Sequence, residues 1–145
     1  MALTEKYIVM CDEVRIEMNG KLILMGVYTP DMTVAQLPTV APVLTFFVML
    51  QDDRPDNHQF RLSVQHLETG HVVAQGMGGF QTPRPGLVPL PVRISPIQFS
   101  SAGAYTFSLF MDNVPNPITY QFNVILNVTP QLPGVPGGGA LGGPR

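Results

Sequence analysis

Apolar and polar residues alternate along most of the chain, and a period of two residues is typical of β-strands. The segment Cys11–Met18 shows the pattern most clearly. Its apolar face carries Val14, Ile16 and Met18, and its polar face carries Glu13, Arg15 and Glu17. We therefore expect a half-buried strand here. Asn19-Gly20 follows and predicts a two-residue hairpin loop, because both residue types tolerate a positive φ.

The return segment Lys21–Tyr28 is apolar on both faces, which predicts a central strand. Similar patterns, separated by turn residues, predict about eight strands in all. They are Cys11–Met18, Lys21–Tyr28, Val43–Gln51, Gln59–His66, His71–Gln75, Val92–Phe99, Ala104–Met111 and Ile118–Val128. No window shows a convincing apolar repeat of 3.6 residues, so we expect no long amphipathic helix.

Short strands at this spacing are typical of two packed antiparallel sheets with Greek-key links. We therefore predict an all-β, immunoglobulin-like β-sandwich, with a closed barrel as the alternative. The sandwich is expected over residues 1–128. Residues 129–145 are rich in glycine and proline, and we expect them to form a flexible C-terminal tail.

Glycines and prolines interrupt the middle of the chain. Gly76, Gly78 and Gly79 fall inside a strand pattern, which suggests a bulge or a weak edge strand. The segment Thr82–Pro91 contains four prolines. Because proline cannot donate to a sheet ladder, this segment is expected to be a loop or a broken edge strand.

The composition adds one unusual feature, a low content of charged residues. Charged residues make up 12% of the chain, where an ordinary domain has about 25%. A surface with few charges gives little electrostatic repulsion between molecules, so the protein could function as part of a larger assembly. A β protein whose turns are rich in Pro and Asn would have the same composition. The net charge of −2 without a basic cluster argues against nucleic-acid binding.

The chain contains one cysteine, Cys11, so it can form no internal disulfide. Its longest apolar run, Val43–Leu50, falls well short of the roughly 20 residues that a membrane-spanning helix needs. The N-terminal apolar run is also shorter than the about 7–15 residues of a secretory signal. We therefore expect a cytoplasmic protein that does not enter a membrane.

Few residues suggest a chemical site. Asp52, Asp53 and Asp56 crowd one loop, and oxygen clusters of this kind can bind calcium; a solvated turn is the other interpretation. His66, Glu68 and His71 surround a predicted turn and are weaker metal candidates. We identify no catalytic constellation and expect no cofactor.

The N-terminal hairpin resembles a known family. The run from Cys11-Asp12 through Arg15 and Gly20-Lys21 to Gly26-Val27-Tyr28 is similar to the opening of a widespread family of uncharacterised small bacterial and phage proteins. The resemblance implies a β-sandwich. It implies no activity and no catalytic residues.

Three functional hypotheses follow. The first is a non-enzymatic protein-interaction or assembly module, including an oligomer or a component of a virion, with a protein partner or a second copy as its ligand. We expect its contacts at residues of the proline-rich segment and of the tail: Pro83, Pro85, Leu87, Pro89, Leu132, Val135 and Leu141. The alternatives are a small-ligand or calcium-binding domain and, less favoured, an enzyme.

Overall fold

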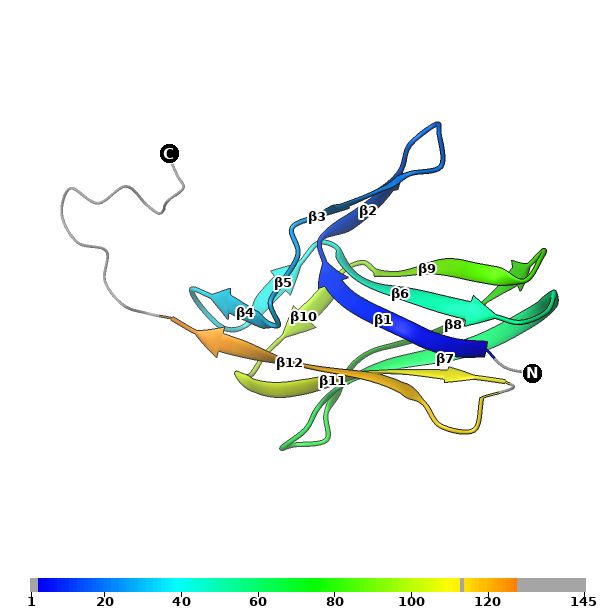
Figure 1. The fold of residues 1–145 in the computed structure, drawn as a ribbon. Helices are drawn as coiled ribbons and strands as arrows, with labels where there is room; N and C mark the ends of the chain where they lie inside the picture. Colours follow the sequence, from blue (N-terminus) through cyan, green and yellow to red (C-terminus); the bar gives the residue numbers. More distant parts are fainter. Residues whose placement is uncertain (1–2, 113, 128–145) are drawn as a thin grey trace.

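Two β-sheets packed face to face make up the body of the protein (Figure 1). The computed structural model describes residues 3–112 and 114–127, which form twelve strands. Their bounds are β1 (Leu3–Cys11), β2 (Glu13–Ile16), β3 (Leu22–Met25), β4 (Asp31–Val34), β5 (Thr39–Ala41), β6 (Leu44–Asp52), β7 (Asp56–His66), β8 (Val72–Thr82), β9 (Gly86–Ile94), β10 (Ile97–Phe99), β11 (Gly103–Met111) and β12 (Ile118–Leu126).

The smaller sheet has the order β1-β6-β9, and the larger has the order β4-β12-β11-β7-β8. Neighbouring strands are antiparallel except β12 and β4, which are parallel. The pairs β2–β3 and β5–β10 form two further, two-stranded sheets. The predicted all-β sandwich is confirmed, with two separate sheets rather than one closed sheet. Among the described residues, no helix is long and apolar enough to span a membrane.

Aromatic side chains from both sheets fill the core. Phe46 of β6 stacks on Phe107 of β11, with ring centroids 4.1 Å apart. Tyr105 and Phe122 stack beside them at 5.7 Å. The strand predicted at Ala104–Met111 is confirmed as β11, and alternate residues of it, Tyr105, Phe107, Leu109 and Met111, are all buried.

The structure has more strands than the eight predicted. The prediction missed β1 because a register shift between Glu5 and Tyr7 breaks the alternation of its side chains. It also missed β4 and β5, which have only four and three residues. Strands this short give too few positions for a period to show.

The proline-rich segment is an edge strand over most of its length. β9 pairs only with β6 within the described residues, and Pro89 and Pro91 lie opposite Met49 and Phe47. An edge strand directs alternate N–H groups away from its neighbour. Two prolines spaced two residues apart can therefore both take positions that need no donor.

The glycine-rich segment lies in β8, which is an edge strand of the larger sheet, as the sequence suggested. The ladder is irregular at Val64/Gln65, opposite the start of β8, and not at the glycines. An added Cβ at Gly78 would lie 2.8 Å from the Phe60 ring. Glycine is therefore needed there for close packing rather than for a bulge.

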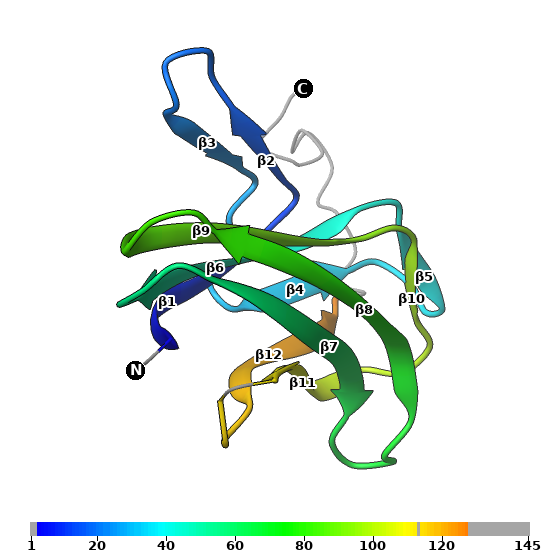
Figure 2. The same cartoon turned by 90° about the vertical axis from the view of Figure 1, so that its right-hand side faces the viewer.

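The segment expected to be a central strand is instead part of a two-stranded arm. Among the residues that the structure describes, β2 and β3 pair only with each other, and they project from the sandwich (Figures 1 and 2). The predicted turn is present, but its loop has three residues, because Glu17 N donates to Lys21 O at 2.8 Å. Of the loop residues, Gly20 alone has a positive φ, at 86°. The two-residue loop predicted for Asn19-Gly20 is therefore wrong.

Candidate functional site

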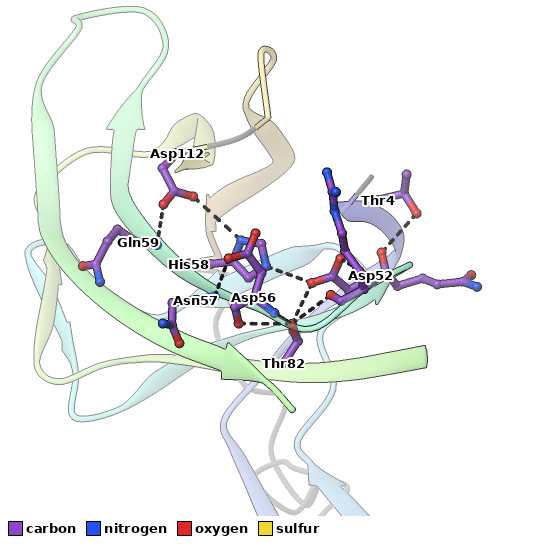
Figure 3. A network of polar contacts seen from close by, with 10 residues as sticks. Thr4, Asp52, Asp56, Asn57, His58, Gln59, Thr82 and Asp112 are labelled. Atoms are coloured by element: carbon purple, nitrogen blue, oxygen red, sulfur yellow. Dashed lines mark hydrogen bonds and ion pairs between the residues drawn. The ribbon is translucent and has the colours of Figure 1, made fainter. Parts of the chain in front are cut away.

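A buried polar cluster joins the two sheets at one end of the sandwich (Figure 3). Asp52 ends β6, His58 lies on β7 and Thr82 ends β8. Asp52 Oδ2 accepts hydrogen bonds from His58 Nε2 and from Thr82 Oγ1, both at 2.8 Å. Asp52 and His58 are each only 3% exposed. The cluster therefore ties the smaller sheet to the larger one.

The hydrogen bonds keep the Asp52 carboxylate ionised in spite of its burial. Burial alone would raise the pKa of Asp52 by disfavouring the charged form. The donors on His58 and Thr82, with a weaker one from the Arg54 backbone, outweigh burial and hold this pKa below its ordinary value. A buried acceptor with three donors is the state in which a carboxylate is least easily protonated.

The second nitrogen of His58 faces an acid on the neighbouring strand connection. Within the described part of the chain, His58 Nδ1 has no hydrogen-bond partner, and it lies 3.8 Å from Asp112 Oδ1. Asp112 Oδ2 instead accepts a hydrogen bond from Gln59 N at 3.1 Å. Because His58 is enclosed, its ring is poorly placed to exchange protons with a substrate. The geometry supports a structural role for the cluster.

The three acids proposed as calcium ligands do not converge. Asp52 points inward to His58 and Thr82, whereas Asp53 and Asp56 are exposed. Asp56 Oδ1 accepts a hydrogen bond from Asn57 N. Among the described residues, no group of three His, Cys, Asp or Glu side chains could hold a metal ion.

The histidines of the other predicted metal site also point apart. His66 is buried, and its ring bonds to Thr69 Oγ1 and to Ala102 O, both at 2.9 Å. Because a carbonyl can only accept, Nε2 carries the proton and Nδ1 accepts from Thr69. His71 is exposed and touches His66 only through its backbone oxygen.

The outer face of the larger sheet carries a shallow depression of about 330 Å³. Met77, Arg61 and Phe110 lie side by side on β8, β7 and β11, and the Arg61 guanidinium lies 4.9 Å from the centre of the Phe110 ring. The depression is open, and its charged side chain is already engaged by an aromatic ring. It does not resemble the enclosed pockets that hold small ligands.

The β2–β3 arm presents an apolar face that is exposed at Ile16 and half-buried at Val14, Leu22 and Leu24. Directly opposite residues share a face, and the pairs Val14–Leu24 and Ile16–Leu22 make one face wholly apolar. Ile16 is 72% exposed, and none of the four side chains packs against the hydrophobic core. The opposite face carries Glu13, Arg15, Glu17, Lys21, Ile23 and Met25.

A compact joint holds the base of the arm. Asp12 N donates to Met25 O at 2.9 Å, the Tyr28 hydroxyl donates to Asp12 Oδ1 at 2.9 Å, and the Thr45 hydroxyl donates to Asp12 O at 3.2 Å. Gly26 has φ +69°, and an added Cβ there would collide with the Asp12 carboxylate. Asp12, Gly26 and Tyr28 belong to the motif that carries the family resemblance, so the motif supplies most of the joint.

The joint also raises the pKa of the Tyr28 hydroxyl. Burial, the hydrogen bond to Asp12 and the charge of Asp12 raise the pKa of Tyr28 to about 12. Each of these effects disfavours a phenolate beside an ionised carboxylate. The hydroxyl therefore remains a donor to Asp12 at any ordinary pH.

The predicted interaction residues of the proline-rich segment lie toward the end of β9 that is away from the arm, because Leu87 pairs with Gln51 whereas Arg93 pairs with Thr45 at the joint. Leu87 and Pro89 are exposed on β9, and Leu87 is 63% exposed. Pro83 and Pro85 lie in the exposed β8–β9 link. A depression lined by Glu13, Val14, Thr45, Pro91 and Arg93 connects the arm to the outer surface of β6 and β9. Leu132, Val135 and Leu141 lie outside the described residues.

Sequence reasoning located the hairpin but not its exposure, and it did not identify the buried cluster. Asp52 and Thr82 are 30 residues apart in the chain, and no local spacing connects them. The sequence holds one hint, which is that Asp52 lies an even number of residues after Leu44, Phe46, Val48 and Leu50, so its side chain belongs to the same, buried face of the strand.

Residues 6–125 match the model of a family described as "Family of unknown function (DUF6941)". No curated protein is significantly similar to the chain.

Among solved structures, the chain is similar to the Pseudomonas fluorescens alkylpurine DNA glycosylase AlkC bound to DNA containing an abasic site analog. The TM-score is 0.52 with 7% sequence identity, and the match covers 85% of this chain. It covers 30% of the glycosylase chain, so the protein spans less than a third of that enzyme's length. At this identity the likeness shows the fold alone.

Proposed function

The chain belongs to DUF6941, a family of unknown function, and we propose from its exposed surfaces that it is a non-enzymatic protein-interaction or assembly module. The β2–β3 arm is its contact element. The observation that carries this proposal is the apolar face formed by Val14, Ile16, Leu22 and Leu24 on a projecting hairpin, which lies outside the hydrophobic core and is most exposed at Ile16.

A two-stranded hairpin that projects from the sandwich is an unusual feature in a protein of this size. A two-stranded hairpin by itself is marginally stable in water, and it becomes stable when a third strand or a packing surface is added. Ile16 remains 72% exposed here. A partner that covers the apolar face would supply the missing packing and gain the free energy of burying that face.

The joint supports the same function. Three backbone or side-chain hydrogen bonds at Asp12 and the positive φ of Gly26 orient the arm relative to the sandwich. A contact element held in one orientation loses less conformational freedom on binding, which favours affinity. The low charge of the chain, at 12%, favours association in general.

The test is a pair of lysine substitutions on the apolar face. We expect Ile16→Lys/Leu22→Lys to abolish association while the thermal unfolding temperature stays close to that of the wild type, because neither side chain packs on the core. Leu67→Lys is the control, because Leu67 is a 49% exposed apolar residue in the distant β7–β8 turn.

Association is measured by analytical ultracentrifugation of the purified protein and by native co-purification with reciprocal tagging of any stoichiometric partner. A wild-type protein that stays monomeric at all concentrations and co-purifies with no polypeptide in constant ratio would refute the proposed function. So would a partner that the double variant retains.

A further inference from the structure

We propose that the arm binds a second copy of this chain, through the open edge of β2 and about a two-fold axis at Ile16. This inference rests on the proposed function and names its partner. The two arms would then form one four-stranded antiparallel sheet in the order β3-β2-β2-β3, with the outer strands β3 at its edges.

The hydrogen-bond pattern of the arm leaves the β2 edge ready to pair. Glu17 N donates to Lys21 O, so Glu17 directs its backbone groups toward β3. Antiparallel strands alternate in this respect, so the backbone groups of Val14 and Ile16 point to the open edge. Within the described residues, β2 has no ladder partner besides β3. Such an edge is a template for another strand.

The charges of β2 are complementary to those of a second β2 when the two-fold axis lies at Ile16. When Ile16 lies opposite Ile16 of a second copy, Arg15 lies opposite Glu17, and the two-fold axis creates this pair twice. Directly opposite residues whose backbone groups do not bond each other are closest in their side chains, with Cα atoms about 4.5 Å apart. Opposite charges at such positions are attractive.

The same register matches the apolar side chains. Val14 of one copy lies opposite Met18 of the other, and the two Ile16 side chains meet at the axis. The apolar faces of both arms then join into one surface. Arg15 and Glu13 are 65% and 42% exposed as side chains, and their own contact is a loose one at 4.0 Å. Arg15 is therefore available for the intermolecular pair.

Neighbouring registers are less favourable. A two-fold axis at Arg15 would place the two arginines opposite each other and Glu13 opposite Glu17, which is repulsive. An axis at Val14 would also place Arg15 opposite Glu13. It would, however, place the apolar Ile16 opposite the charged Asp12 and leave Glu17 without an opposite charge. Asp12 is engaged in the joint, and its carbonyl accepts the Thr45 hydroxyl at the surface of the body.

The other edge of the arm offers no comparable match. Leu22, Ile23, Leu24 and Met25 make up β3, and no charged pair selects one register among them. Pairing through β3 would also leave the alternating charges of β2 without partners. The β2 edge is therefore the one that the observations favour.

The first test exchanges the two charges and measures mass by sedimentation. The chain has a mass of 15.8 kDa, so a dimer sediments with twice that mass. Arg15→Glu alone and Glu17→Arg alone each bring like charges together twice. We expect each to weaken dimerisation about tenfold or more. An equal mixture of the two variants restores both opposite-charge pairs, so we expect it to dimerise.

Lys6→Glu and Glu68→Arg are the controls, because they make the same changes of net charge away from the arm. We expect both to dimerise like the wild type. Equal dimerisation of the two single arm variants and the wild type would refute the register. A mixture that fails to dimerise while the wild type dimerises would refute it as well.

The second test is disulfide trapping with Ile16→Cys. At the axis, the two residues have Cα atoms about 5.5 Å apart, which a disulfide can span. We expect this variant to form a covalent dimer under mild oxidation. Ile23→Cys is the comparison variant. In the proposed dimer the two β2 strands lie between the two β3 strands, so the residues at position 23 are too far apart to form a disulfide. The native Cys11 is buried and should not cross-link. Cross-linking through position 23 alone would place the contact at β3 and overturn the proposal.

The two proposals fail in different ways. A protein that is monomeric at all concentrations, but binds another polypeptide in a manner that Ile16→Lys/Leu22→Lys abolishes, would overturn the second-copy proposal and leave the interaction module standing. A protein that associates equally well with these lysines in place would refute both.

Discussion

Ile16 lies directly opposite Leu22 near the tip of the β2–β3 arm, and the hydrophobic core of the sandwich reaches neither side chain. This pairing follows from the three-residue loop, in which Glu17 N bonds to Lys21 O. A two-residue loop would shift the register by one and mix Ile23 and Met25 into the apolar face. The local geometry of one turn therefore creates the surface on which the proposed function depends.

The hydroxyl of Thr82 should contribute to stability through the buried cluster. Thr82→Val keeps the shape of the side chain but removes the donor to Asp52 and an acceptor for Asp56 N. We expect a loss of about 1–3 kcal/mol in the free energy of unfolding, measured by urea denaturation. Thr4→Val makes the same chemical change at an exposed hydroxyl that lies 3.5 Å from its acceptor, and it should be nearly neutral. Equal effects would show that the cluster is not a special source of stability.

The depressed pKa of Asp52 predicts a loss of stability in acid. A carboxyl whose pKa is lower in the folded state contributes stability that is complete above its unfolded pKa, which the reference value of 3.8 represents. The contribution is lost as the pH falls through the lower folded value. Asp52→Asn should therefore unfold more easily than the wild type at pH 7, and the difference should shrink below about pH 4.

Urea midpoints measured from pH 7 down to pH 3 would check this prediction. Asp53→Asn is the matched control, because Asp53 is the exposed neighbour and its substitution should leave the profile almost unchanged. A constant difference between Asp52→Asn and wild type over this range would contradict the linkage.

Two glycines in β8 should respond oppositely to the same substitution. At Gly78 the new methyl group would lie 2.8 Å from the Phe60 ring, so Gly78→Ala must displace a half-buried aromatic side chain. We expect a loss of about 1–3 kcal/mol. At Gly76 it would meet Leu62 at 3.9 Å, an ordinary contact. Gly76→Ala should be neutral or stabilising by up to about 1 kcal/mol, because alanine loses less backbone entropy on folding. Thermal or chemical denaturation of the pair decides the question.

The joint predicts that the arm can be loosened without unfolding the sandwich. Tyr28→Phe removes the hydroxyl that donates to Asp12. We expect hydrogen exchange of the β2 and β3 amides to accelerate by about three- to tenfold, which corresponds to roughly 1 kcal/mol, while the amides of β11 remain protected. Tyr7→Phe, at a 48% exposed tyrosine, is the control. Uniform acceleration across the whole chain would contradict a local role for this hydrogen bond.

The sequence predicted best the strands whose environment differs most between their two faces. β11 was predicted as a strand because its buried aromatic and aliphatic residues occupy every second position, from Tyr105 to Met111. β9 was left undecided between a loop and an edge strand, because the effect of its prolines depends on the presence of a neighbour on one side only.

The candidate sites were harder to predict than the strands. Asp52, Asp53 and Asp56 are close in sequence and suggested a common ligand set, but backbone geometry turns Asp52 inward and leaves the other two at the surface. His58 lies only six residues from Asp52, but their hydrogen bond forms because β6 and β7 come together at one end of the sandwich. Nearness along the chain does not indicate the direction of a side chain.

By itself the sequence determined the local features of this protein. These are the period of two, the positions of most turns, and the hairpin at Asn19-Gly20, because they depend on residues within a few positions of one another. Only the tertiary structure decided whether an apolar face is covered. Val14, Ile16, Leu22 and Leu24 have the pattern of core residues, but the core is completed by residues from distant strands, such as Phe46 and Phe107. Burial depends on which surfaces meet, and not on the hydrophobicity of one segment, so the arm is left outside the core with Ile16 exposed.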